Sequence, residues 1–167
     1  MAEEVKTSPI NLESLGEFIR GEITLQELHQ IHGDDLMDLA RAGEMLFAQG
    51  QLDQAQIAFE GLTALNPHIG HFHTALGCIY FRQQKKDEAL TEYSLAIEKN
   101  PNDIDAYANR GELRLTNGDI EGALNDLNQA ISLDPQQDVS KKNPVAMRAL
   151  TLAMALKETI TQQSANQ

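Results

Sequence analysis

Tryptophan is absent from this 167-residue chain, and cysteine occurs once, at Cys78. A single cysteine excludes an internal disulfide, so nothing in the sequence indicates an oxidising compartment. Aromatic residues make up only 5% of the sequence although hydrophobic residues make up 41%. Small and aliphatic side chains must therefore do most of the packing, which is typical of closely stacked helices.

Positive charge is also scarce, because 13 lysines and arginines face 25 aspartates and glutamates, for a formal net charge of −12. An acidic surface repels phosphate backbones and anionic lipids, which disfavours nucleic acid and membrane headgroups as partners. No apolar run approaches the roughly 20 residues that span a bilayer, and the acidic first residues lack a signal-peptide core. We expect a cytoplasmic protein without stable membrane association, of a length that fits one domain.

What the chain does contain is a 34-residue period. A glycine, an alanine, a bulky apolar residue and a proline each recur three times at this step: Gly43, Gly77 and Gly111; Ala55, Ala89 and Ala123; Phe59, Tyr93 and Leu127; Pro67, Pro101 and Pro135. This is the period of the tetratricopeptide repeat, a pair of antiparallel helices. The sequence therefore predicts an all-α solenoid of three repeats at 36–69, 70–103 and 104–137.

The recurring positions have predicted roles. We expect each glycine to meet the alanine of the second helix, where the two helices approach too closely for a β-carbon. The proline ends the second helix and turns the chain. Gly50 and Gly118 mark the turn inside repeats one and three, where repeat two has Gln84.

Helices are also predicted before the repeats, in the region 9–35, after a disordered segment at 1–8. An apolar stripe there consists of Leu12, Leu15, Phe18 and Ile19. Thr24 and Glu27 form a capping box that opens a short helix carrying Leu25, Leu28 and Ile31. Asp34 and Asp35 are expected to cap the first repeat helix.

A polar linker at 138–143 and a capping helix at 144–162, opened by Pro144, follow the repeats. One apolar stripe is expected to cover repeat three, as the end of a solenoid requires, and consists of Val145, Ala149, Leu152, Leu156 and Ile160. A second stripe consists of Met147, Leu150 and Met154. It fits either further packing in the cap or an interaction surface, because methionine makes adaptable contacts.

The first helix of each repeat lines the concave face of such arrays, and its second, fifth, ninth and twelfth residues point inward. With Asn109, whose carboxamide could bond a peptide backbone, this rule predicts a peptide groove lined by Met37, Ala40, Glu44, Phe47, His71, Thr74, Cys78, Phe81, Asp105, Ala108, Asn109, Glu112 and Leu115. The twelfth position is apolar in all three repeats, which favours pockets for apolar side chains of an extended segment. The alternative for Phe47 and Phe81 is packing inside their own repeats.

Other chemistry finds little support. Some repeat proteins clamp the carboxylate tail of heat-shock chaperones, but Glu44 and Asp105 would repel an anion here and only Asn109 fits. The histidines, including His71 and His73 two residues apart on a helix, do not converge as zinc ligands must. Cys78 has no predicted cation beside it and is expected to be a small groove or core residue. We expect no enzyme, no metal and no cofactor.

Several stretches resemble the class II chaperones of bacterial type III secretion, which guard translocator proteins. The similar segments are Phe18-Ile19-Arg20-Gly21-Glu22-Ile23-Thr24, Ala48-Gln49-Gly50-Gln51-Leu52-Asp53-Gln54-Ala55 with Phe59-Glu60, Leu76-Gly77-Cys78 and Tyr93-Ser94. The layout of N-terminal helices, three repeats and one closing helix is similar over residues 12–162.

The resemblance implies a virulence-associated bacterial chaperone that holds a hydrophobic translocator by an extended N-terminal segment of that client. It also implies a homodimer formed through Leu12, Leu15, Phe18 and Ile19, although the same stripe could pack onto repeat one. The alternative is a general tetratricopeptide adaptor in another bacterial assembly.

Overall fold

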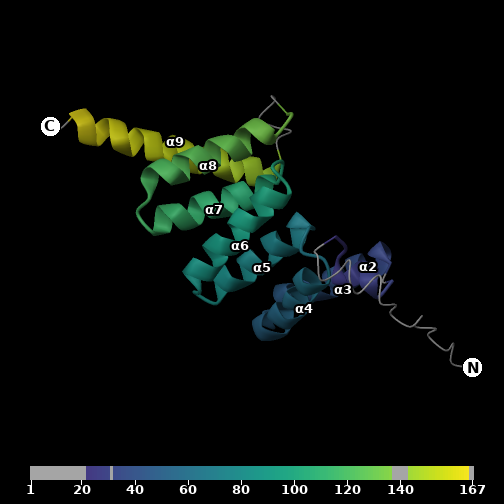
Figure 1. Ribbon diagram of the computed structural model, residues 1–167. Helices are drawn as coiled ribbons and strands as arrows, with labels where there is room; N and C mark the ends of the chain where they lie inside the picture. The colour runs from purple at the N-terminus through teal and green to yellow at the C-terminus, as the bar shows by residue number, and fades with distance from the viewer. Residues whose placement is uncertain (1–21, 31, 137–142, 166–167) are drawn as a thin grey trace, which may run out of the picture. The chain divides into compact units, whose positions relative to one another are not determined.

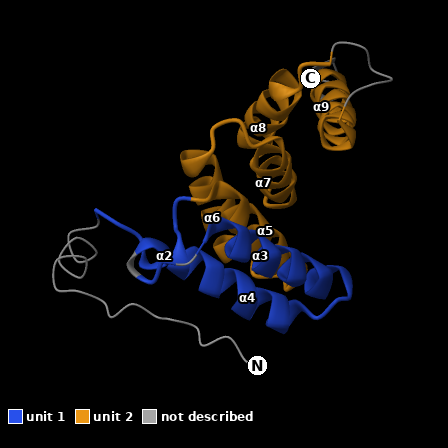
Figure 2. Cartoon of the chain, turned by 90° about the vertical axis from the view of Figure 1, so that its right-hand side faces the viewer, with its two compact units in different colours: residues 1–68 blue, residues 69–167 orange. Residues whose placement is uncertain are grey.

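The computed structural model describes residues 22–30, 32–136 and 143–165, and within these ranges the chain is all-α (Figure 1). The helices are α2 (Leu25–Leu28), α3 (Gly33–Ala48), α4 (Leu52–Leu65), α5 (Gly70–Arg82), α6 (Lys86–Lys99), α7 (Ile104–Thr116), α8 (Ile120–Leu133) and α9 (Pro144–Ala165). Figure 2 shows two compact units: one ends at His68 and contains α2 to α4, and the other begins at Ile69 and contains α5 to α9.

Each helical pair is closed by a glycine that faces the bulky residue of the second helix. A β-carbon built on Gly77 would lie 2.6 Å from the ring of Tyr93, and one on Gly43 would lie 2.8 Å from the ring of Phe59. In the third pair, a β-carbon built on Gly111 would lie 2.9 Å from the side chain of Leu127. The bulky residue therefore comes nearer to each glycine than the predicted alanine does, although the backbone oxygen of Ala123 also lies 3.3 Å from the β-carbon position of Gly111. The alanines are buried, but it is the large side chain that leaves no room for a β-carbon on the glycine.

The turn inside each helical pair has a residue in the left-handed conformation at the equivalent position. Gly50 and Gly118 have φ of +78° and +82°, as the sequence predicts for glycine in a turn. Gln84 holds the equivalent place with φ of +64°. A residue with a β-carbon pays about 1 kcal/mol for this conformation, so the turn is kept in repeat two at some cost to stability.

The start of the first unit confirms the predicted capping box. The backbone N–H of Glu27 donates to the Thr24 hydroxyl at 3.2 Å, and the backbone N–H of Thr24 donates to the Glu27 carboxylate at 2.7 Å. The helix is shorter than predicted, because α2 ends at Leu28. Its Gln26 accepts a hydrogen bond from Asn66 at 2.7 Å, which ties α2 to the end of α4.

Two other predictions for this region have different outcomes. The N-cap of α3 is His32, so Asp34 and Asp35 lie inside the first turn and do not cap it with their side chains. Their charge still complements the positive end of the helix dipole. The stripe of Leu12, Leu15, Phe18 and Ile19, like Ile31, lies outside the described residues.

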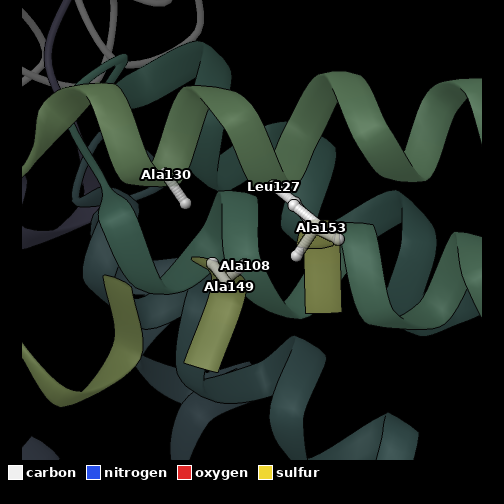
Figure 3. Close-up of a cluster of buried hydrophobic side chains, with 5 residues drawn as sticks. All are labelled: Ala108, Leu127, Ala130, Ala149 and Ala153. Atoms are coloured by element: carbon white, nitrogen blue, oxygen red, sulfur yellow. The ribbon is translucent and has the colours of Figure 1, made fainter. Parts of the chain in front are cut away.

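Helix α9 begins at Pro144, as predicted, and packs against both α7 and α8. Figure 3 shows the buried cluster that joins them, which consists of Ala108, Leu127, Ala130, Ala149 and Ala153. Four of these five side chains are alanine, so the helices can approach closely. Val145, Leu152 and Leu156 of the first predicted stripe pack around this cluster, whereas Ile160 lies outside it and is 38% exposed.

A buried ion-pair network ties α7 to α8 and α6 in the second unit. The guanidinium of Arg110 donates to both carboxylate oxygens of Asp126 at 2.8 Å and to the hydroxyl of Ser94 at 3.1 Å. Arg114 lies 2.9 Å from the same carboxylate. Only 5% of the Asp126 side chain is exposed, and its charge is therefore balanced inside the protein by two arginines.

Candidate peptide-binding groove

The predicted groove residues are divided between the two units. In the first unit α3 carries four of them: Met37 and Phe47 are half-buried, Glu44 is exposed and Ala40 is buried. The other nine lie on α5 and α7 of the second unit, whose geometry is described here by itself.

Not all of these residues line a surface. Ala108 is fully buried in the cluster beneath α9, so it supports the groove from behind, and Ala40 is equally inaccessible to a partner. Thr74 is buried as well, and its hydroxyl donates to the carboxylate of Asp103 at 2.7 Å. The other oxygen of Asp103 accepts from the backbone N–H of Ala106 and so caps α7. Thr74 therefore fixes the start of α7 against α5.

Apolar side chains occupy the twelfth position of each first helix, as the period predicts. Phe47, Phe81 and Leu115 are all half-buried, which leaves part of each side chain accessible. Phe81 also packs against the buried cluster of Ala89, Tyr93 and Leu113. Both interpretations of Phe81 therefore apply to it in part: it supports its own repeat and presents a remaining apolar surface.

Cys78 lies on α5 of the second unit, and its sulfur accepts two hydrogen bonds. Its sulfur accepts from the Asn109 carboxamide at 3.3 Å and from the Tyr93 hydroxyl at 3.5 Å. Burial raises the pKa of the Cys78 thiol, chiefly by desolvation. The thiol is thus protonated at neutral pH, which agrees with a packing residue and not with a nucleophile.

The most informative contact comes from a residue that the sequence analysis did not single out, Arg148 on α9. Its Nη2 donates to the carboxamide oxygen of Asn109 at 2.7 Å, and its Nε lies 2.6 Å from the carboxylate of Glu112. Both partners belong to the predicted inner face of α7. The signal in the sequence was that Arg148 is the only charged residue from Pro144 through Leu156.

This contact follows from where α9 lies. Helix α9 packs against α8 and α7 in the same way that α7 packs against α6 and α5. It therefore takes the place that the first helix of a fourth repeat would hold. The groove side of the second unit thus has contributions from α5, α7 and α9.

The inner face of α7 is acidic. Desolvation raises the pKa of the Asp105 carboxyl, and the nearby charge of Asp103 raises it further. Arg148 and His71 act in the opposite direction on the same carboxyl. A cation in a bound partner would relieve this local excess of negative charge, whereas an anionic partner would increase it.

A cluster of metal-ligating side chains and a membrane-spanning helix are two further kinds of feature that the described residues could contain. No group of three histidine, cysteine, aspartate or glutamate side chains in these ranges could hold a metal ion. Across the same ranges, none of the helices combines the length and apolarity that crossing a bilayer demands.

Two family models match the second and third predicted repeats. A family model described as TPR repeat matches residues 77–118, and another described as tetratricopeptide repeat matches residues 104–137. Residues 77–137 are thus similar to tetratricopeptide repeats. The second match covers the same residues as the third predicted repeat.

Curated relatives match this chain over only part of their own length. Hsp70-Hsp90 organizing protein 3 of Arabidopsis thaliana is 39% identical over 70 residues, which is 42% of this chain and 12% of the relative. Tetratricopeptide repeat protein 36 of Xenopus tropicalis is 36% identical over 70 residues, and the match covers 35% of its length. The chain thus spans well under two thirds of the length of these relatives.

Solved structures extend the likeness to most of the chain. A type III secretion complex from Aeromonas hydrophila has a TM-score of 0.77 at 21% identity, covering 89% of this chain and 98% of that one. The translocator chaperone SycD of Yersinia enterocolitica has a TM-score of 0.71 at 21% identity, covering 80% and 98%. PcrH of Pseudomonas aeruginosa, bound to the chaperone-binding region of PopD, has a TM-score of 0.69 at 24% identity, covering 77% and 96%. At these identities the likeness establishes a shared fold: tetratricopeptide repeats with flanking helices.

Proposed function

We propose that this tetratricopeptide protein is a cytoplasmic chaperone of a type III secretion system that binds a hydrophobic translocator. The observation that supports it most is the fold it shares with SycD and PcrH, over nearly the whole length of those chains. PcrH has been solved with the chaperone-binding region of PopD, and SycD with a peptide of the translocator YopD. The resemblance of the sequence to the same family points in the same direction.

The mechanism we infer is equilibrium holding of an extended client segment. A translocator exposes apolar surface and would aggregate or insert into a membrane too early if left alone. In the second unit the half-buried side chains of Phe81 and Leu115 offer apolar contact for residues of such a segment, and in the first unit the half-buried Phe47 offers another apolar contact. Holding of this kind needs no nucleotide, and release is left to the export apparatus.

A heat-shock-tail receptor is the competing function, and the relatives give it some weight. One similar structure is the first TPR of Spaghetti (RPAP3) bound to an HSP90 peptide, with a TM-score of 0.67 and 21% identity. An acidic peptide of that kind needs cations on the inner face. Here Asp105 and Glu112 lie on that face, and the one arginine near them already pairs with Glu112. We therefore favour the translocator client, with a general adaptor in another bacterial assembly as the remaining alternative.

The decisive experiment is capture of the client. Phe47→Glu and Phe81→Glu should each abolish co-elution with the translocator, because a charge in an apolar contact must be desolvated. The matched control is Ile57→Glu, since Ile57 is 70% exposed on α4 and is not a predicted groove residue. Pull-down from native cells, with the partner identified by mass spectrometry, provides the measurement. Normal binding by both phenylalanine variants, with folding intact by circular dichroism, would contradict the groove.

Homodimerisation through the N-terminal region is a further part of the proposal. SycD crystallises as a dimer, and the resemblance assigns Leu12, Leu15, Phe18 and Ile19 to the interface. Deleting residues 1–20 should yield a folded monomer, since it removes this apolar stripe. Light scattering measures the mass, and a mass unchanged by the deletion would rule out this interface.

A further inference from the structure

Arg148 constrains the orientation of the carboxamide of Asn109. The guanidinium has only donors, so the group of Asn109 that faces it at 2.7 Å must be the oxygen. The amide nitrogen then faces the sulfur of Cys78 at 3.3 Å, which is a weak acceptor. With the carboxamide turned over, the NH₂ group would face a cation that accepts nothing, so this orientation is excluded while Arg148 stays in place.

Arg148 is itself held from a second side. The carboxylate of Glu112 lies 2.6 Å from its Nε, one helical turn along α7 from Asn109. About half of the Arg148 side chain is exposed, so this ion pair contributes little to the stability of the fold. Its consequence is geometric, because it fixes the guanidinium beside Asn109.

These contacts use only half of the hydrogen-bonding capacity of Asn109. A carboxamide offers two hydrogens and two acceptor positions, and the structure uses one of each. Asn109 is half-buried, so part of the group is accessible. The remaining hydrogen and acceptor position match the C=O and N–H that the main chain of an extended peptide presents.

We propose that Arg148 is a positioning residue for client binding, which holds the carboxamide of Asn109 in a single orientation for hydrogen bonds with the client main chain. The inference rests on the proposed function, because it deepens the account of the same groove. It assigns to α9 a part in recognition through Arg148, which is separate from the predicted cap and from the apolar stripe of Met147, Leu150 and Met154. The ligand feature it concerns is the main chain of an extended segment, whatever side chains that segment carries.

The test measures binding of a synthetic peptide of the client segment mapped on the captured translocator. Arg148→Ala should weaken binding about tenfold, the value of one orienting hydrogen bond of about 1.4 kcal/mol. Arg148→Lys should remain within about threefold of wild type, because lysine can also donate to the Asn109 oxygen. Lys157→Ala, which removes an exposed positive charge from the same helix, should bind as wild type does.

A double-variant cycle separates positioning from a direct contact. If Arg148 acts through Asn109, adding Arg148→Ala to Asn109→Ala should cost nothing beyond Asn109→Ala alone. If the double variant loses affinity by the product of the two single losses, the inference is overturned. Wild-type affinity in Arg148→Ala would overturn it as well. Failure to capture any translocator would instead refute the proposed function itself, so the two failures are distinguishable.

Discussion

Replacing Asp126 with alanine is expected to lower the free energy of unfolding by about 3–5 kcal/mol. The carboxylate accepts both hydrogen bonds of the Arg110 fork and also pairs with Arg114. Only 14% of the Arg110 side chain is exposed, so its charge would be left inside the protein without the counter-ion that the Asp126 carboxylate provides. Urea denaturation followed by circular dichroism measures the change.

The matched control removes an ion pair from the surface. Asp38 and Arg41 pair on α3 with side chains 69% and 68% exposed, and Asp38→Ala should cost less than about 1 kcal/mol. Equal losses for the two variants would show that the buried network does not hold α6, α7 and α8 together in the way described.

Replacing Gly77 with alanine is expected to destabilise the protein by about 2 kcal/mol, although alanine is the better helix former. The new β-carbon would lie 2.6 Å and 2.7 Å from two atoms of the Tyr93 ring. Tyr93 is only 1% exposed, so the ring has no free space into which to move. Thermal and urea denaturation both report the loss.

Gly61→Ala is the control, and the expected sign is opposite. Gly61 lies inside α4, and nothing comes within 4 Å of the β-carbon that alanine would add. Alanine should therefore stabilise this helix by about 0.5–1 kcal/mol. Two changes of the same sign would mean that helix propensity, and not the contact with Tyr93, governs the glycine in α5.

The sequence predicted the helical pairs because their causes are local or periodic. The capping box of Thr24 and Glu27 depends on residues three apart, and the left-handed turns at Gly50 and Gly118 depend on single residues. The 34-residue period also identified the positions that matter in each pair. It could not say which of two recurring residues meets the glycine, because alanine and the bulky residue share the same period.

The candidate site was less predictable because it depends on contacts between elements. Arg148 belongs to no period, and its pairing with Asn109 spans 39 residues along the chain. Ala40 and Ala108 follow the inward rule for a first helix, yet the packed neighbours bury them. The rule gives the direction of a side chain from its own helix, whereas burial depends on every element packed nearby.

The pairing of glycine with a large side chain also limits the order in which these repeats can change during evolution. In α5 the glycine faces a rigid aromatic ring at 2.6 Å, so a mutation of Gly77 is tolerable only after Tyr93 has become smaller. In the third repeat the partner is Leu127 at 2.9 Å, which is as deeply buried as the ring, and the backbone oxygen of Ala123 lies 3.3 Å from the same β-carbon position. We expect homologues to lose the glycine at 43, 77 or 111 only together with a smaller residue at the facing position.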